Sequence, residues 1–136
     1  MADIRNVFDV GARALSAQMV RMNTVASNLA NAGTVASTAD DAFRALRPVF
    51  ETEFSRSQQG LSTTTVQDVV MLDREPERLY RPDHPAADKD GFVYAAAVNT
   101  EEEMVEMVEA SRQYQNTLQA MSTLRALMAR TVQMGQ

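Results

Sequence analysis

Apolar residues recur at alternating spacings of three and four at both ends of the chain. The N-terminal stripe consists of Ile4, Phe8, Gly11, Leu15, Gln18, Met22, Val25 and Leu29. The C-terminal stripe consists of Met104, Met107, Ser111, Tyr114, Leu118, Met121, Arg125, Met128 and Val132. This repeat is typical of amphipathic helices that pair along a seam. We therefore predict one long helix at each end, the two packing as a coiled-coil-like pair.

The charges of the C-terminal helix are ordered along its length. Thr100 and Glu103 have the spacing of a capping box, which predicts the helix start. Glutamates crowd the first turns and arginines follow later, as the helix dipole favours. The run Glu101–Glu103 could also bind a metal ion. A solvated first turn that compensates the dipole explains the run fully, so no metal site is expected.

The segment between the helices is different in character. Residues 43–54 and 61–72 have the composition of strands, with a turn around Gly60. The segment 79–94 contains two prolines and closes on Asp90-Gly91, a hairpin-type turn. We predict an α+β fold with three parts: an N-terminal helix in 1–33, a small β-rich middle domain in 34–98 and a C-terminal helix in 99–136.

Composition excludes several classes of function. The chain has no cysteine, so disulfides, zinc-thiolate sites and thiol catalysis are ruled out. Its net charge of −5 argues against a nucleic-acid partner. The single histidine, His84, stands between Asp83 and Pro85, where a rigid turn with a hydrogen-bonded imidazole is the simplest interpretation. We expect no enzyme activity, no cofactor and no small-molecule substrate.

The N-terminal stretch contains charges that interrupt every apolar run. Asp3, Arg5, Asp9 and Arg13 leave neither a cleavable signal peptide nor a membrane anchor. No apolar run in the chain is long enough to span a membrane. If the protein leaves the cytoplasm, we expect it to do so without a cleaved signal.

Small and apolar residues extend beyond a single stripe on both helices. A two-helix pair buries only one face of each helix, so the remaining positions favour contacts with other chains, and the helices are expected to order fully only with such partners. The sequence thus predicts an assembly subunit. The residues that we expect at its interface are Phe8, Leu15, Met22, Asn28, Leu29, Asn31, Met104, Met107, Tyr114, Leu118, Met121 and Met128.

The sequence at the C-terminal end of the first predicted helix is SNLANAGT, residues 27–34. Asparagine is a mediocre helix former because its amide competes for backbone groups. Asn28 and Asn31 can bond either to their own chain or to a neighbouring subunit, and both alternatives stay open. Gly33 is suited to a left-handed helix cap.

Four segments, in order, resemble the flagellar basal-body rod protein family. They are IRNVFDVGARALSAQMVRMNTVASNLANAGT at the start, FRALRPVF and YRPDHPAADKDGFV in the middle, and EEMVEMVEASRQYQNTLQAMSTLRALM at the end. The motif SNLAN marks the wider family of axial proteins, whereas the middle segment with the two prolines and the histidine is more discriminating.

The resemblance implies a structural subunit of the rod, the drive shaft that crosses the periplasm from the membrane ring to the hook. It implies export by the flagellar type III apparatus without cleavage, terminal helices in an inner tube, and a middle domain that faces outward. The implied partners are other rod proteins and the adaptor at the membrane ring and export gate, with surrounding periplasmic ring proteins as further candidates. The alternative is a soluble helical adaptor or export chaperone, which the β-rich middle disfavours.

Overall fold

The computed structural model describes residues 6–54 and 62–135. Two long helices stand before and after a β-rich middle in the sequence, so the predicted α+β fold is confirmed. The elements, in chain order, are α1 (Val7–Asn31), β1 (Val35–Ala36), β2 (Leu46–Phe54), β3 (Ser62–Met71), β4 (Arg78–Tyr80), β5 (Phe92–Ala95) and α2 (Thr100–Met134).

Helix α1 begins after Asn6, whose Oδ1 accepts hydrogen bonds from the backbone N–H groups of Phe8 at 2.9 Å and Asp9 at 3.0 Å. Ile4, the first member of the predicted stripe, lies outside the described residues. At the other end the left-handed cap predicted for Gly33 is wrong: among the described glycines only Gly91 has a positive φ. The helix ends in a tighter turn in which Ala32 N–H donates to Leu29 O at 3.3 Å.

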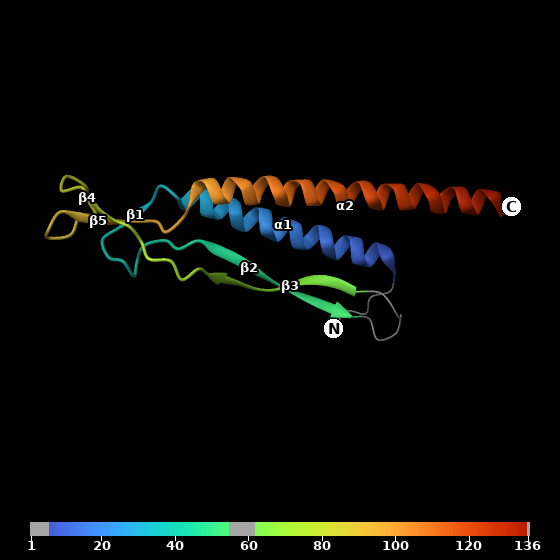
Figure 1. Ribbon diagram of the computed structural model, residues 1–136, viewed down its shortest axis with the longest axis horizontal. Coiled ribbons are helices and arrows are strands. Elements are labelled where there is room, and N and C mark those ends of the chain that lie inside the picture. Colours follow the sequence, from blue (N-terminus) through green and yellow to red (C-terminus); the bar gives the residue numbers. More distant parts are fainter. Residues whose placement is uncertain (1–5, 55–61, 136) are drawn as a thin grey trace.

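Helices α1 and α2 run antiparallel, side by side (Figure 1). Gln18 donates to Gln113 across the pair at 3.1 Å, and Arg21 Nε donates to Glu106 at 2.9 Å. Near the start of α1 the Met121 side chain packs against Gly11, where an added Cβ would lie 2.6 Å from Met121 Sδ. Helix α2 has 35 residues and α1 has 25, so the end of α2 extends beyond α1 (Figure 1).

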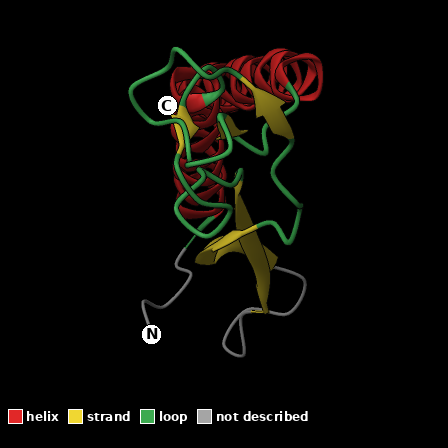
Figure 2. Cartoon of the chain, turned by 90° about the vertical axis from the view of Figure 1, so that its left-hand side faces the viewer, coloured by secondary structure: helices red, strands yellow, loops and turns green. Residues whose placement is uncertain are grey.

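Strands β2 and β3 form a two-stranded antiparallel hairpin that packs on α1. Its register shifts between Val49 and Phe50, which marks a β-bulge. Figure 2 shows the helices on one side of the molecule and the hairpin on the other. The two predicted strands are confirmed with slightly shorter bounds, whereas the turn predicted around Gly60 lies outside the described residues.

The remaining strands form a small sheet in the order β1-β5-β4, antiparallel throughout. The turn between β4 and β5 closes where predicted: Gly91 N–H donates to Asp88 O at 3.0 Å and Gly91 has φ +82°. Asp88 Oδ1 also accepts from the N–H of Phe92 at 2.8 Å. Only glycine adopts this backbone conformation without strain, which explains the glycine at this position.

Helix α1 is the central element of the fold. It contacts α2 on one side and both hairpin strands on the other (Figure 1). Arg13 donates to Glu53 of the hairpin at 2.9 Å. The hairpin therefore covers one side of α1 within the chain, whereas Ala12, Met19 and Ala26, which lie beyond the predicted stripe, stay exposed. Their contact with other chains stays a prediction.

The core is built mainly from alanine and valine. Its buried apolar residues are Ala17, Val25, Ala42, Ala45, Val93, Ala96, Ala97 and Ala110. Side chains of this size bury little apolar area each, so polar contacts between the elements contribute a larger share of the stability of the fold. In the part of the chain that the structure describes, no helix has the length and apolar character needed to cross a membrane.

Candidate assembly interface

The side of α2 that packs against α1, which we call the seam, differs from the predicted stripe. Every second member of the seam lies one residue earlier in the sequence than predicted. The inward residues are Glu103, Met107, Ala110, Tyr114, Thr117, Met121 and Leu124. Their alternating spacings of four and three are those of a helix pair. Three predicted interface residues, Met107, Tyr114 and Met121, belong to this seam and are half-buried within the chain.

The other predicted residues of α2 lie on its outer side. Met104 is 53% exposed, Leu118 is 51% exposed and Met128 is 53% exposed. Further large apolar residues are exposed along α2, and these are Val105, Val108, Leu127, Val132 and Met134. In the described part of the chain each of these side chains is about half exposed or more, so the outer side of α2 offers apolar area to a partner.

The predicted residues of α1 lie deeper in the fold. Phe8, Leu15, Met22 and Leu29 are half-buried. The side of α1 that remains exposed presents mainly small residues, which are Ala12, Ser16, Met19, Asn23, Ala26 and Ala30. Any neighbour that approaches α1 would therefore meet this small-residue surface first. The assembly role of the α1 residues stays a prediction.

Asn28 joins three elements of the chain. It is completely buried, and its Nδ2 donates to Leu46 O of β2 and to Glu103 Oε2 of α2, both at 2.9 Å. Its Oδ1 accepts from Leu46 N–H at 2.8 Å. The amide thus pairs with the backbone of β2 as a neighbouring strand would, and it also binds α2. Of the two alternatives for Asn28, the structure places these hydrogen bonds within the chain.

Glu103 is the centre of this cluster. Its side chain is 1% exposed, and Arg47 Nη1 lies 2.7 Å from Oε1 and 2.9 Å from Oε2. A buried carboxylate is costly unless it is paired and hydrogen-bonded, and here Arg47 and Asn28 meet both needs. We name Asn28, Arg47 and Glu103 the polar triad. It fastens α1, β2 and the first turn of α2 to one another.

The predicted capping box is therefore wrong. Asn99 caps α2, since its Oδ1 accepts from the N–H groups of Glu101 at 3.0 Å and Glu102 at 3.2 Å. Glu103 points into the fold, so it does not belong to a solvated first turn either. The sequence signal for this role is weak: Glu103 stands one heptad step before Ala110 on the true seam, and its partners lie far away in the chain.

Asn31 has a local role. Its Nδ2 donates to Ser27 O at 2.8 Å, one turn back along α1. Its own backbone carbonyl accepts from Thr34 N–H at 3.0 Å and from the Thr34 hydroxyl at 2.7 Å. These hydrogen bonds cap the C-terminal end of α1 and lie within the chain, which was one of the two alternatives for Asn31. Any contact of Asn31 with another subunit stays a prediction.

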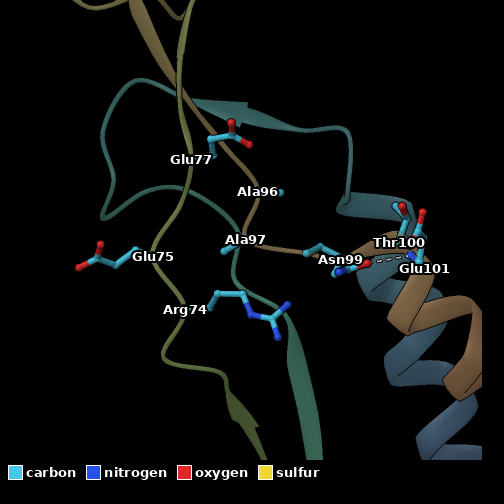
Figure 3. A pocket seen from close by; sticks show the side chains of 9 residues that line it. Arg74, Glu75, Glu77, Ala96, Ala97, Asn99, Thr100 and Glu101 are labelled. Atoms are coloured by element: carbon cyan, nitrogen blue, oxygen red, sulfur yellow. Dashed lines mark hydrogen bonds between the residues drawn. The ribbon is translucent and has the colours of Figure 1, made fainter.

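An open pocket lies beside the start of α2 (Figure 3). Arg74, Glu75 and Glu77 reach it from the segment after β3, and Asn99 and Glu101 line it from the helix. In the described ranges no group of three or more histidine, cysteine or acidic residues is arranged to hold a metal ion. The pocket is an open hollow in the surface with a net acidic lining.

His84 adopts the predicted turn. Its N–H donates to Arg81 O at 3.1 Å, and its Nδ1 accepts from Ala86 N–H at 3.1 Å. The interpretation of a hydrogen-bonded histidine in a rigid turn is confirmed. The imidazole serves to shape the segment between β4 and β5.

Comparison with known proteins places these features in a family. The sequence profile described as "Flagella basal body rod protein" matches residues 8–35, and the profile described as "Flagellar basal body rod FlgEFG protein C-terminal" matches residues 89–134. These matches cover nearly the whole of α1 and the whole of α2.

Relatives of full length agree with the profiles. The flagellar basal-body rod protein FlgC of Salmonella typhimurium is 36% identical over 133 residues, 96% of this chain and 97% of that protein. The protein of the same name from Yersinia enterocolitica is 36% identical over 132 residues, with the same coverage. That of Aquifex aeolicus is 35% identical over 131 residues, 96% of each chain. The chain belongs to the family of flagellar basal-body rod protein FlgC.

Proposed function

We propose that this protein is a structural subunit of the flagellar basal-body rod, in its proximal part, and that it helps to transmit torque from the membrane ring to the hook. The observation that carries the proposal is the outer surface of α2. Met104, Leu118 and Met128 are each about half exposed along one long helix, next to a seam already filled by α1. Exposed apolar surface on this scale marks contacts with other proteins.

The role is mechanical rather than enzymatic. A rod subunit needs contacts that repeat along an axis, with one surface of a subunit meeting a different surface of the next. Helices α1 and α2, in the parts 1–33 and 99–136, supply a rigid pair for the inner wall of such a tube. The β-rich part 34–98 then faces outward.

The nearest partners in this proposal are other rod proteins on the outer surface of α2. At the base of the rod the partner is the adaptor that joins it to the membrane ring and export gate. Periplasmic ring proteins around the rod are candidates for the outward-facing middle part, where Tyr80 is 65% exposed.

Fractionation of cells tests the proposal. A tagged copy that restores swimming to a strain lacking this chain should co-purify with intact basal bodies and stay with them after mild detergent and salt washes. Recovery only with cytosolic export clients would contradict the rod role and support the chaperone alternative. An electron density map of the isolated basal body would then locate the subunit within the rod.

A further inference from the structure

Gly11 is the single glycine of α1, and the side chain of Met121 fills the space beside it. After proline, glycine is the least favourable residue in a helix interior, so its presence there needs a reason. A Cβ at position 11 would lie 2.6 Å from Sδ, 2.9 Å from Cγ and 3.2 Å from Cε of Met121. The thioether therefore lies directly against α1, in a space that a larger residue at position 11 would take from it.

This contact and the hydrogen bonds between the two helices lie at different ends of the pair. The hydrogen bonds join Gln18 to Gln113, Arg21 to Glu106 and Asn28 to Glu103. Because the helices are antiparallel, these bonds lie toward the start of α2, whereas the Met121 contact lies toward the start of α1. The first turns of α1 thus meet α2 through packing that includes the Met121 thioether.

The described methionines divide into two groups by exposure. The exposed group, at 49–82%, consists of Met19, Met71, Met104, Met128 and Met134. The half-buried group consists of Met22, Met107 and Met121. Oxidation of an exposed thioether leaves the new oxygen in water, whereas oxidation of a packed one places a polar atom among apolar neighbours. Only the half-buried group can therefore change how the helices pack.

Within that group, Met121 differs from the other two in its surroundings. Met22 and Met107 are adjacent in sequence to Arg21 and Glu106, whose ion pair joins the helices at that point. Met121 lies instead against the backbone of a glycine. A change at its sulfur therefore acts on the end of the pair that is farthest from the polar triad.

We propose that Met121 is a modification site: a peroxide oxidises its thioether to the sulfoxide, and the first turns of α1 then separate from α2. The sulfur lone pair attacks one oxygen of hydrogen peroxide and forms an S–O bond as the O–O bond breaks. The proton of the attacked oxygen passes to the departing hydroxide, which leaves as water. Sulfur loses two electrons and the peroxide gains them, so the step needs no other reactant.

Separation follows from the hydrogen-bonding needs of the new oxygen. A sulfoxide oxygen accepts hydrogen bonds, but the N–H groups of α1 beside it already donate within the helix. Val10 N–H, for example, donates to Asn6 O at 3.3 Å. An unpaired polar atom in this contact is unfavourable, so the oxidised side chain rotates into water and leaves the space at Gly11 empty. The change is reversible, because methionine sulfoxide reductases restore the thioether.

Titration of the isolated protein with hydrogen peroxide tests the proposal. Mass spectrometry of peptides measures the sulfoxide at each methionine, and amide hydrogen exchange measures local opening. In molecules with Met121 sulfoxide, residues 7–15 should exchange ~10-fold faster or more, because a lost packing contact makes local opening easier. Exchange of residues 103–110 should stay unchanged. Treatment with the reductases for both sulfoxide epimers should restore slow exchange.

Three variants make the test specific. Met121→Leu keeps a similar volume without a sulfur, so residues 7–15 should keep slow exchange at the same peroxide dose. Met128→Leu, at an exposed position seven residues further along α2, is the matched control and should respond like the wild type. Gly11→Ala displaces the thioether toward water, so Met121 should oxidise ~3-fold faster or more, since oxidation follows exposure.

Three results would overturn the proposal. They are Met121 sulfoxide with unchanged exchange in residues 7–15, a Met121 that stays reduced while the exposed methionines are fully oxidised, and an equal response in Met121→Leu. If Met121→Leu fails to fold, the wild-type titration still decides, because oxidised and reduced molecules are compared in one sample. The response needs only the folded monomer, so its failure would leave the proposed rod role unaffected.

Discussion

The two ends of α2 have the same helical backbone but differ in what holds them. At the start, Glu103 is buried and bound to Arg47 and Asn28, which fastens the helix to β2 and α1. At the other end, residues 125–134, the overhang of α2 beyond the start of α1, are exposed throughout. The helix therefore begins as part of the chain's own fold and ends as exposed surface, where we propose that a partner binds.

This difference implies unequal local stability. Backbone hydrogen bonds that are covered by packing open only with much of the fold, whereas those in an exposed helix end open locally. A helix as short as residues 125–134 is only marginally stable in water on its own. The helical structure of this segment therefore depends on the residues that neighbour it. The following predictions compare buried and exposed members of the same helices, in order of decreasing effect on the free energy of unfolding.

The largest effect is expected from Glu103→Ala. The substitution leaves the Arg47 guanidinium and the Asn28 amide without their partner in a buried position, at a cost of about 3–5 kcal/mol. Urea unfolding followed by circular dichroism measures this loss. Glu109 is exposed and accepts a hydrogen bond from Gln113 on the same helix, so Glu109→Ala should change the free energy of unfolding by no more than about 0.5 kcal/mol. Equal effects of the two would contradict the role of the polar triad.

Asn28→Ala should have the second largest effect. It removes three hydrogen bonds and leaves the Leu46 backbone groups unsatisfied, which costs about 2–3 kcal/mol. Asn31→Ala, only one turn away, removes a bond to its own helix and gains helix propensity, so its net effect should be within about 0.5 kcal/mol. The same urea titration compares the pair. A more damaging Asn31→Ala would reverse the assignment of the two asparagines.

Part of this architecture is readable from the sequence, and the reasons are physical. The heptad repeats predict two long helices because a helix with such a pattern must bury one face. The β-branched run Thr63–Val66 and the Asp90-Gly91 pair predict a hairpin and a turn through local preferences alone. Each of these features depends on residues close together in the chain.

The register of the seam could not be read in the same way. Met104 and Leu118 are more apolar than Glu103 and Thr117, so the pattern favoured the wrong neighbour in each pair. The true seam is set by Arg47 and Asn28, which bind Glu103 from 56 and 75 residues away. A carboxylate with the spacing of a capping residue gives no sign of such distant partners. Burial of Glu103 is a tertiary effect that outweighs the local signal.

A third prediction compares one substitution in two environments. Val25 of α1 is 1% exposed, and Val25→Ala removes two buried methyl groups and leaves a cavity, at a cost of about 2 kcal/mol. Val105→Ala on the outer surface of α2 should be neutral or slightly stabilising, because alanine has the higher helix propensity. Thermal unfolding distinguishes the two. A destabilising Val105→Ala in a verified monomer would show that this surface is covered within the chain.

The smallest effect on the monomer, and the largest in the cell, is expected from Leu118→Asp. Leu118 is half exposed, so the monomer should lose only about 0.5 kcal/mol, the difference in helix propensity. Between subunits the same aspartate becomes a buried charge without a partner, which costs several kcal/mol and should block rod completion and swimming. Unfolding in urea, electron microscopy of basal bodies and soft-agar swimming measure the three effects.

Gln119→Asp, the adjacent exposed position, controls for added charge on α2. Full-length rods and normal swimming with Leu118→Asp would exclude this surface from the assembly, whereas lost export with a stable monomer would assign it to secretion.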